Sequence, residues 1–275
     1  MPICIECRYP VHQLYSTYSA ADDRSLGKGV RLTQCPRCKR FADKYVEHDF
    51  VVLFIDLVLI KPQVYRHLLF NRLGREDDRF DPSIVRLGVL LLLFDVYLTW
   101  ARIEKQTPPF LSPDSSSPTT SSPAFGRLAD QPIVLQYLFF LLLCLTESIT
   151  FHFTVRLLST LLLAYPRPNS VSTALFVSSC TKLLPILMVI WDYDVPAAAR
   201  SVGWAVVVNN VEALKILLEC GYGTAGAVAG AGAAVRLATR WAILTAVGLE
   251  EADRVPGIGV GEVVRWGWRV GSGAR

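Results

Sequence analysis

The sequence predicts a mainly α-helical, polytopic transmembrane bundle that carries a small zinc ribbon at its N-terminus. Apolar residues make up 52% of the 275 residues and charged residues only 19%, whereas about a quarter of a typical soluble domain is charged. The apolar residues gather in long runs after residue 83. No ten-residue alternating pattern of the kind found in membrane-spanning strands accompanies them, which favours helices.

Residues 1–50 contain two CxxC pairs, Cys4–Cys7 and Cys35–Cys38, with 27 residues between them. Two such pairs can place four thiolates tetrahedrally around one Zn²⁺, and a site closed by four thiolates is structural rather than catalytic. The alternative is two disulfides, which a reducing cytosol would not preserve. The nearest spare ligands, His12 and His48, are expected to be surface or neighbouring residues rather than ligands.

Residues 51–83 form a neck between the zinc ribbon and the first span. The apolar run 51–60 is interrupted by Asp56 and rises only ~15 Å as a helix, too short for a ~30 Å hydrocarbon core. The basic, amphipathic segment after Pro62 is predicted to lie in the headgroup plane of the membrane. The predicted lipid-contact residues are Tyr65, Arg66, His67 and Arg72. Two alternatives stay open: the neck packs on the zinc ribbon as core, or its arginines pair with residues 76–78.

The first transmembrane helix is predicted over residues 84–106, followed by a disordered Ser/Pro loop over 107–131. The remaining bundle covers 132–250, and a C-terminal tail covers 251–275. Inside the bundle, 132–152 and 171–191 are the strong candidates for spans. The segments 202–219 and 224–248 are marginal, because the first is polar and the second contains two arginines.

Polar residues inside the predicted spans are the candidate functional residues of the membrane region. They are Asp95, Glu147 and Lys182, and Lys182 is expected to pair with Asp95 or Glu147. Ionisable groups in hydrocarbon are costly and usually face a bundle interior or one another. They indicate either interhelical packing or a pathway for lipid or ions. Basic residues on the N-terminal side of the first span predict that the N-terminus is cytosolic.

Residues 3–73 resemble the Arv family. The resemblance rests on CIEC with PV and LY after it, on RLTQCPRCKRFADKY, and on VLFIDLVLIKPQVYRHLLFNR. The chain departs from the family pattern at Arg8-Tyr9, where members often have Gly-His, and at Lys39, where glycine commonly follows the last cysteine. Neither departure affects a cysteine ligand, so only the shape of the two turns is in question.

The resemblance implies an endoplasmic reticulum membrane protein, also found in the Golgi, that acts in sterol distribution and sphingolipid balance. It also implies support for early glycosylphosphatidylinositol-anchor precursor supply. The protein would carry out these roles by lipid transfer or flipping. The alternative is a non-catalytic scaffold or regulator of a membrane glycosyltransferase complex. The expected partners are sterol, anionic phospholipid, anchor precursor and glycosyltransferase subunits, not nucleic acid. The only enzyme-like motif is Asp192-Tyr-Asp194, and no catalytic domain accompanies it, so no enzyme activity is expected.

Overall fold

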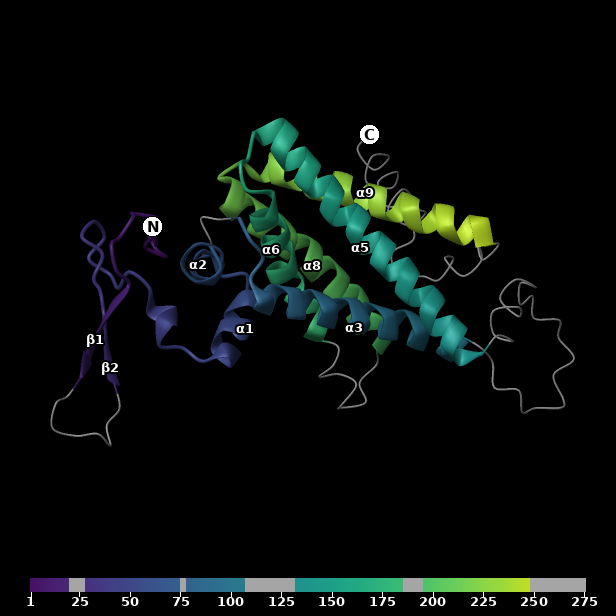
Figure 1. Ribbon diagram of the computed structural model, residues 1–275, viewed down its shortest axis with the longest axis horizontal. Coiled ribbons are helices and arrows are strands. Elements are labelled where there is room, and N and C mark those ends of the chain that lie inside the picture. The colour runs from purple at the N-terminus through teal and green to yellow at the C-terminus, as the bar shows by residue number, and fades with distance from the viewer. Residues whose placement is uncertain (20–27, 75–77, 107–131, 185–194, 248–275) are drawn as a thin grey trace, which may run out of the picture. The chain divides into compact units, whose positions relative to one another are not determined.

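The computed structural model describes residues 1–19, 28–74, 78–106, 132–184 and 195–247 (Figure 1). The chain forms two compact units, each described separately below. Unit 1 consists of Met1–Val85, Arg156–Thr181 and Ala205–Ala229, and unit 2 of Arg86–Val155, Lys182–Trp204 and Gly230–Arg275. The elements are β1 (Tyr15–Ser19), β2 (Lys28–Leu32), the 3-10 helix η1 (Lys44–Val46), α1 (Phe50–Val58), α2 (Pro62–Arg66), the π-helix η2 (His67–Arg72), α3 (Pro82–Gln106), α5 (Ile133–Leu163), α6 (Pro168–Ser178), the 3-10 helix η3 (Ser179–Leu183), α8 (Val195–Leu218) and α9 (Tyr222–Val247).

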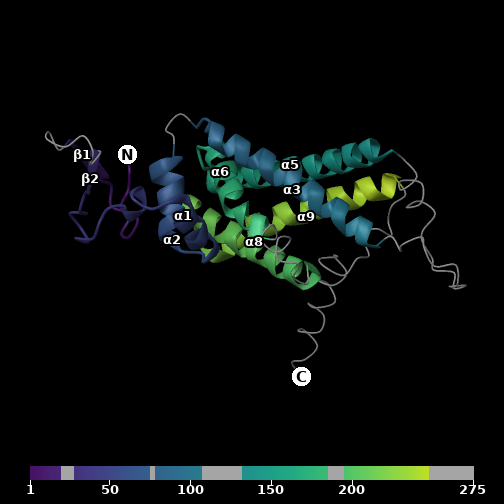
Figure 2. The same ribbon diagram turned by 90° about the horizontal axis from the view of Figure 1, so that it is seen from below.

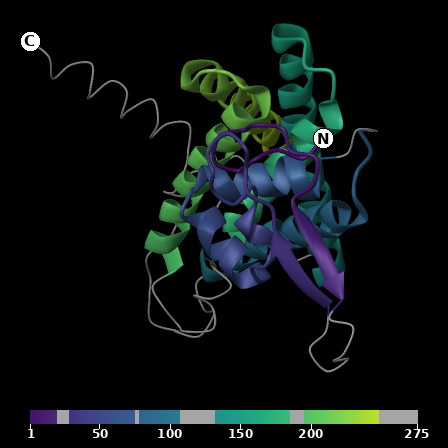
Figure 3. The same ribbon diagram turned by 90° about the vertical axis from the view of Figure 1, so that its left-hand side faces the viewer.

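The predicted fold class is confirmed: among the described residues, strands occur only in the N-terminal head. Strands β1 and β2 pair antiparallel with Thr17 opposite Val30, and they form a two-stranded sheet between the two CxxC pairs (Figure 3). Apart from the isolated bridge between Gln34 and Phe41, everything described after Leu32 is helix or connection. Because backbone groups inside a bilayer must bond within their own segment, helices suit the apolar runs.

Helix α1 occupies most of the interrupted apolar run and ends in a Schellman motif. The amide of Lys61 donates to the carbonyl of Asp56 at 3.1 Å, and the amide of Ile60 donates to that of Leu57 at 3.1 Å. This ending places Ile60 at φ 56°, where glycine is the usual residue. Pro62 then opens α2 in its first turn, as expected from its fixed φ. The run is therefore one short helix followed by a break.

Among the described residues, three helices are long and apolar enough to cross a membrane: Pro82–Thr99 within α3, all of α5, and all of α9. The first two agree with the predicted spans, and the third is the segment 224–248 that the sequence left marginal. The predicted span 171–191 is not among these three helices. Its described part is α6 followed by the 3-10 turn η3, and residues 185–191 lie outside the described residues. The proposed loop 107–131, the tail 251–275 and Asp192-Tyr-Asp194 also lie outside them.

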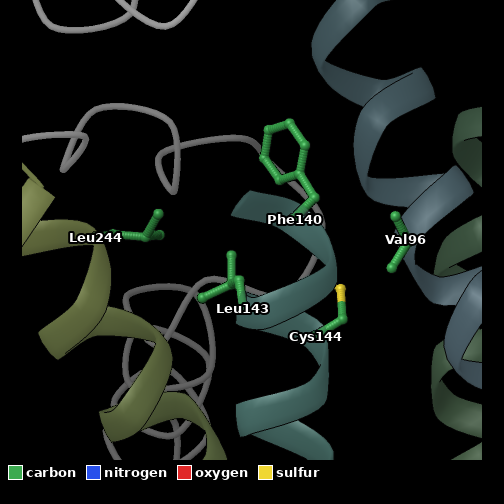
Figure 4. Packing of buried hydrophobic residues seen from close by; sticks show 5 residues of the cluster. All are labelled: Val96, Phe140, Leu143, Cys144 and Leu244. Carbon is green, nitrogen blue, oxygen red and sulfur yellow. The ribbon is translucent and has the colours of Figure 1, made fainter. Parts of the chain in front are cut away.

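The core of unit 2 joins α3, α5 and α9 through apolar side chains. Figure 4 shows Cys144 of α5 on the side of Val96, and Leu143 toward Leu244 of α9. Helix α9 approaches α5 closely at Gly232, where an added Cβ would lie 2.6 Å from Cγ2 of Val155. The GxxxG pair of α9, Gly226 and Gly230, behaves differently. A Cβ at either position would meet no atom within 4 Å.

In unit 1, α6 packs beside the C-terminal half of α8 (Figure 2). Ser178 of α6 donates its hydroxyl to Oδ1 of Asn210 of α8 at 2.5 Å, and both side chains are buried. Asp78, which ends the neck, accepts from the backbone amides of Asn169 and Ser170 at 3.2 and 3.1 Å. It therefore stabilises the first turn of α6, where backbone donors lack helical partners.

Candidate metal centre and charged cluster

The two CxxC turns have the same backbone geometry. The amide of Cys4 donates to the carbonyl of Tyr9 at 2.8 Å, and that of Cys35 donates to the carbonyl of Arg40 at 2.8 Å. In each turn the residue after the second cysteine has a positive φ of 61°; these residues are Arg8 and Lys39. Both depart from the glycine-containing family pattern, and the structure explains that pattern because a left-handed φ favours glycine.

The four cysteine sulfurs converge on one point. Their Sγ atoms all lie within 4.8 Å of one another, with Cys4 to Cys38 at 3.7 Å and Cys7 to Cys35 at 3.5 Å. A tetrahedral zinc with Zn–S bonds of ~2.3 Å requires sulfurs ~3.8 Å apart. All seven cysteines of the chain carry free thiols, in agreement with the preference for metal ligation over disulfides. The cluster could hold a metal ion, and its donor set fits zinc.

The local environment differs between the thiols of this cluster. Burial raises the pKa of Cys4 to about 12. Burial would also raise the pKa of Cys35, but hydrogen bonds from the amides of Cys38 and Arg37 outweigh it and lower that pKa to about 7. Since a metal binds thiolates, a bound metal would displace the thiol protons of the cluster.

His12 and His48 are not part of the described metal cluster. His48 instead contacts the carbonyl of Lys44 through Nδ1 at 2.7 Å. That neither histidine is a ligand stays a prediction. The described part of the chain provides a candidate site of four sulfurs.

The neck residue Arg66 contacts the first CxxC turn directly. It donates from Nη1 to the carbonyl oxygens of Ile5 at 2.6 Å and Glu6 at 3.0 Å, the two residues between Cys4 and Cys7. Asn71 adds a pair of bonds to the main chain of Ile3: its Oδ1 accepts from the amide at 2.8 Å, and its Nδ2 donates to the carbonyl at 3.0 Å. The neck thus fixes the residues on both sides of Cys4.

Asp43 lies at the centre of these contacts and is fully buried. Its Oδ2 lies 2.6 Å from Nδ1 of His67 and accepts from Nδ2 of Asn71 at 2.7 Å, while its Oδ1 accepts from the amide of Tyr45 at 3.0 Å. The π-helix η2 carries both His67 and Asn71, and π-helical bonding is uncommon and frequently found at functional sites. Neither Asp43 nor Asn71 was predicted from the sequence as a functional residue.

Among the four predicted lipid-contact residues, Tyr65 and His67 are buried, and Arg66 has the backbone partners described above. Arg72 lies over the ring of Phe50, with Cζ 4.6 Å from the ring centroid. The structure therefore shows the alternative arrangement, in which this part of the neck packs on the zinc head. Their contact with lipid stays a prediction. Among the acidic residues expected as alternative partners of the neck arginines, Asp78 instead accepts hydrogen bonds from the first turn of α6. Residues 76–77 lie outside the described residues.

Unit 2 contains a second group of polar residues, which we call the charged cluster: Asp95, Glu147, Lys182, Arg236 and Arg240. The Nζ atom of Lys182 donates to Oδ2 of Asp95 at 2.9 Å, one of the two pairings that the sequence suggested. Glu147 is 1% exposed and accepts from Nε of Arg236 at 3.0 Å and Nη1 of Arg240 at 3.2 Å. The two arginines that made 224–248 a marginal span therefore have a buried carboxylate as their partner.

Together, the apolar spans, the four-cysteine head and the charged cluster define a polytopic membrane protein with an N-terminal metal-binding module. Comparison with known proteins agrees: the model of the Arv1-like family matches residues 3–214, and the chain belongs to this family. It is 41% identical over 216 residues to Protein arv1 of Schizosaccharomyces pombe, covering 78% of this chain and 74% of that protein. It is 28% identical over 222 residues to Protein ARV1 of Homo sapiens, covering 78% and 72%. No solved structure matches the chain.

Proposed function

We propose that this protein moves or flips lipids across the endoplasmic reticulum membrane. Through that activity it would support sterol distribution, sphingolipid balance and the supply of an early glycosylphosphatidylinositol-anchor precursor. Membership of the Arv1-like family and three membrane-capable helices support the proposal. The observation that carries it is the charged cluster, because it offers several charged side chains within one apolar helical unit.

A lipid headgroup that crosses a bilayer must lose water, and polar groups in hydrocarbon are costly unless they find partners. The charged cluster supplies both signs of charge: the carboxylates of Asp95 and Glu147, and the cations of Lys182, Arg236 and Arg240. Each carboxylate already has a cationic partner in the protein. In the proposal, a passing headgroup phosphate displaces the carboxylates as the partner of the cations. The carboxylates pair with the cations again once the headgroup has left.

The proposed activity is non-catalytic, with the metal as a structural zinc. Four thiolates close a zinc site, and zinc in such a site contributes to folding rather than to chemistry. The proposed partners are sterol, anionic phospholipid and the anchor precursor, without nucleic acid. The proposed location is the endoplasmic reticulum, extending to the Golgi, with the N-terminus in the cytosol, where thiolates stay reduced.

A second candidate is a scaffold that supports a membrane glycosyltransferase complex of anchor synthesis. The observation that favours it is the rigid connection of the neck to the metal-binding head, since Arg66, Asn71 and His67 all bind the head. A preorganised surface of this kind suits recruitment of a protein partner. The scaffold requires no movement of lipid, which separates the two candidates experimentally.

The test uses the purified full-length protein in phosphatidylcholine liposomes that contain a fluorophore-labelled phospholipid. A membrane-impermeant reductant bleaches only the label in the outer leaflet, so further bleaching reports movement across the bilayer. We expect the protein to accelerate movement over protein-free liposomes. The double variant Asp95→Asn with Lys182→Gln removes one ion pair without leaving an unpaired buried charge. It should fold and slow the movement by about tenfold if about 1.4 kcal/mol of barrier lowering is lost.

Thr146→Val is the matched control, because Thr146 neighbours Glu147 on α5 but donates only to the carbonyl of Leu142 in its own helix. It should move lipid at the wild-type rate. A wild-type protein no faster than protein-free liposomes would overturn the proposal and favour the scaffold. A folded double variant with the wild-type rate would show that the charged cluster is not the path.

A further inference from the structure

The second CxxC turn forms one wall of a cleft of about 360 Å³ on unit 1. Three cations from the turn and the residues after it line the cleft, namely Lys39, Arg40 and Lys44, and a single carboxylate, Glu6, faces them. Nη1 of Arg40 lies 3.5 Å from Oε2 of Glu6, so two of the three cations remain in excess over the acid. The cleft therefore suits an anionic ligand.

Backbone hydrogen bonds hold the cleft in shape. The amide of Ile5 donates to the carbonyl of Ala42 at 2.9 Å, and the amide of Ala42 donates to the carbonyl of Thr33 at 2.8 Å. Gln34 and Phe41 face each other in an antiparallel bridge. These bonds join the two turns across the cleft and fix the backbone beneath the cations. A fixed backbone presents the three cations to an anion at lower conformational cost than a mobile one.

An exposed aromatic side chain stands beside these cations. Phe41 lines the cleft and is 52% exposed, although it lies between the charged Arg40 and the buried Ala42. Aromatic rings next to cations are typical of the bilayer interface, where the ring enters the headgroup layer. A soluble anion such as free phosphate would gain nothing from an apolar ring at the rim of its site.

Helix α1 and its C-cap residue, in the same unit, expose a further row of apolar side chains: Val51, Ile55 and Leu59. Its opposite side is buried through Leu53 and Leu57. The hydroxyl of Tyr45, next to Lys44 of the cleft, donates to Oδ2 of Asp56 of α1 at 2.8 Å. The cleft and the helix are thus joined within one unit, and an unpartnered apolar helix side is expected where a bilayer is the neighbour.

We infer that this cleft binds the phosphate-bearing headgroup of an anionic phospholipid at the membrane surface. Lys39 and Lys44 contact the phosphate, Arg40 holds Glu6 away from it, and Phe41 enters the bilayer beside it. The site lies in the zinc head and differs from the neck residues expected to contact lipid. The inference rests on the proposed membrane location but not on lipid movement, so either one can fail without the other.

The test uses the full-length chain in phosphatidylcholine nanodiscs with a graded fraction of phosphatidylinositol phosphate. The readout is hydrogen exchange of the amides of residues 34–44 and 50–58. We expect both segments to become protected as the anionic lipid increases. The variant Lys39→Gln with Lys44→Gln should weaken the apparent affinity about 30-fold, because each basic residue near an anionic surface contributes about a factor of five.

The matched control is Arg8→Gln with Arg31→Gln, which removes the same charge from outside the cleft and should retain the protection. The single variant Lys44→Gln changes a residue outside the CxxC turn and should weaken the apparent affinity about fivefold. The test therefore remains valid even if the double variant loses its metal. Equal protection of the amides in neutral and anionic discs would overturn the inference. The inference would also fail if the control variant lost as much affinity as Lys39→Gln with Lys44→Gln. Equal protection by soluble inositol phosphate in neutral discs would overturn it as well, since the ligand would then be a free phosphate.

Discussion

Arg66 donates a hydrogen bond from Nη1 to the carbonyl of Ile5 at 2.6 Å, and Ile5 lies beside the candidate metal ligand Cys4. A neck residue thereby holds the main chain of the first CxxC turn in place. Burial lowers the pKa of the Arg66 guanidinium. The connection links the stability of the metal site to the neck.

The first prediction is that Arg66→Gln weakens metal retention. Hydrogen bonds to charged groups contribute about 1.5–3 kcal/mol. The variant should therefore lose zinc at a chelator concentration that is lower than the wild-type value by roughly tenfold or more. Arg72→Gln is the matched control, because Arg72 lies over the Phe50 ring and such a contact contributes about 0.5–1 kcal/mol at exposed sites. Identical chelator curves for the two variants would contradict a bracing role for Arg66.

The second prediction concerns the metal itself. Full-length protein should contain one zinc per chain, and Cys35→Ser should remove it, because a structural site needs all four thiolates. Cys220→Ser, a free cysteine outside the cluster, should keep the metal. Elemental analysis of the purified proteins measures both. Wild-type protein without zinc, or zinc retained by Cys35→Ser, would rule out the four-sulfur assignment.

The third prediction is that Lys39→Gly stabilises the head. A non-glycine residue in the left-handed region costs about 1–2 kcal/mol, and part of this is returned by the extra freedom of glycine in the unfolded chain. The net gain should be up to about 1 kcal/mol, seen as a higher chelator concentration for metal loss. Arg37→Gly changes a residue of the same turn whose φ is not positive, and it should instead lower the chelator concentration for metal loss. A loss of stability in Lys39→Gly would show that its side chain matters more than its φ.

The fourth prediction concerns acid stability through Asp56. Burial would raise the pKa of this carboxyl, but hydrogen bonds from Lys61 at 2.6 Å and Tyr45 at 2.8 Å outweigh it and hold the pKa below its usual value. A depressed folded pKa contributes stability above the unfolded pKa of about 3.9, and this contribution is lost as the pH falls through the folded value.

The stability difference between the wild type and Asp56→Asn should therefore be constant above about pH 5 and shrink below about pH 4. Comparing the two proteins cancels the loss of metal in acid, which affects both. Asp49→Asn is the control, since Asp49 precedes α1 without a side-chain capping bond. A difference that persists at low pH would show that the carboxylate is not what stabilises Tyr45 and Lys61.

The fifth prediction contrasts two glycines of α9. A Cβ at Gly232 would lie 2.6 Å from Val155 Cγ2 and 3.0 Å from Phe151, so Gly232→Ala should destabilise by about 1–3 kcal/mol through overpacking. A Cβ at Gly230 meets nothing within 4 Å, and Gly230→Ala should stabilise by up to about 1 kcal/mol through helix propensity. Thermal unfolding in detergent compares them. The same sign for both would contradict the close approach of α9 to α5 at Gly232.

Several of these features could be predicted from the sequence, because their signals are local. The CxxC spacing identified the four cysteines whose sulfurs converge, and the apolar runs identified α3 and α5. The cost of a lone charge in hydrocarbon predicted that Lys182 pairs with Asp95 or Glu147, and the pair with Asp95 is present. Partners that depend on the tertiary fold could not be predicted. Arg66 has the same amphipathic pattern whether it contacts lipid headgroups or the carbonyls of Ile5 and Glu6.

Hydropathy alone also does not distinguish protein from lipid as the neighbour of an apolar side chain. It favoured 171–191 as a span, and of this segment Val171, Ala174 and Leu175 are buried inside unit 1, while 185–191 lie outside the described residues. It made 224–248 marginal because of Arg236 and Arg240, whose partner Glu147 lies on another helix. In both cases the deciding contact comes from a residue far away in the sequence, which a local window cannot include.

Unit 1 is assembled from three separate stretches of chain, the last of which ends at Ala229. During synthesis, the head and neck leave the ribosome first, but α6 and the second half of α8 are made only after α3 and most of α5. Chains lengthen at ~5–20 residues per second, so the head waits for many seconds without its packing partners. Early metal capture, which needs only residues 4–38, would give the nascent chain a folded seed that protects its thiols until the partner helices arrive.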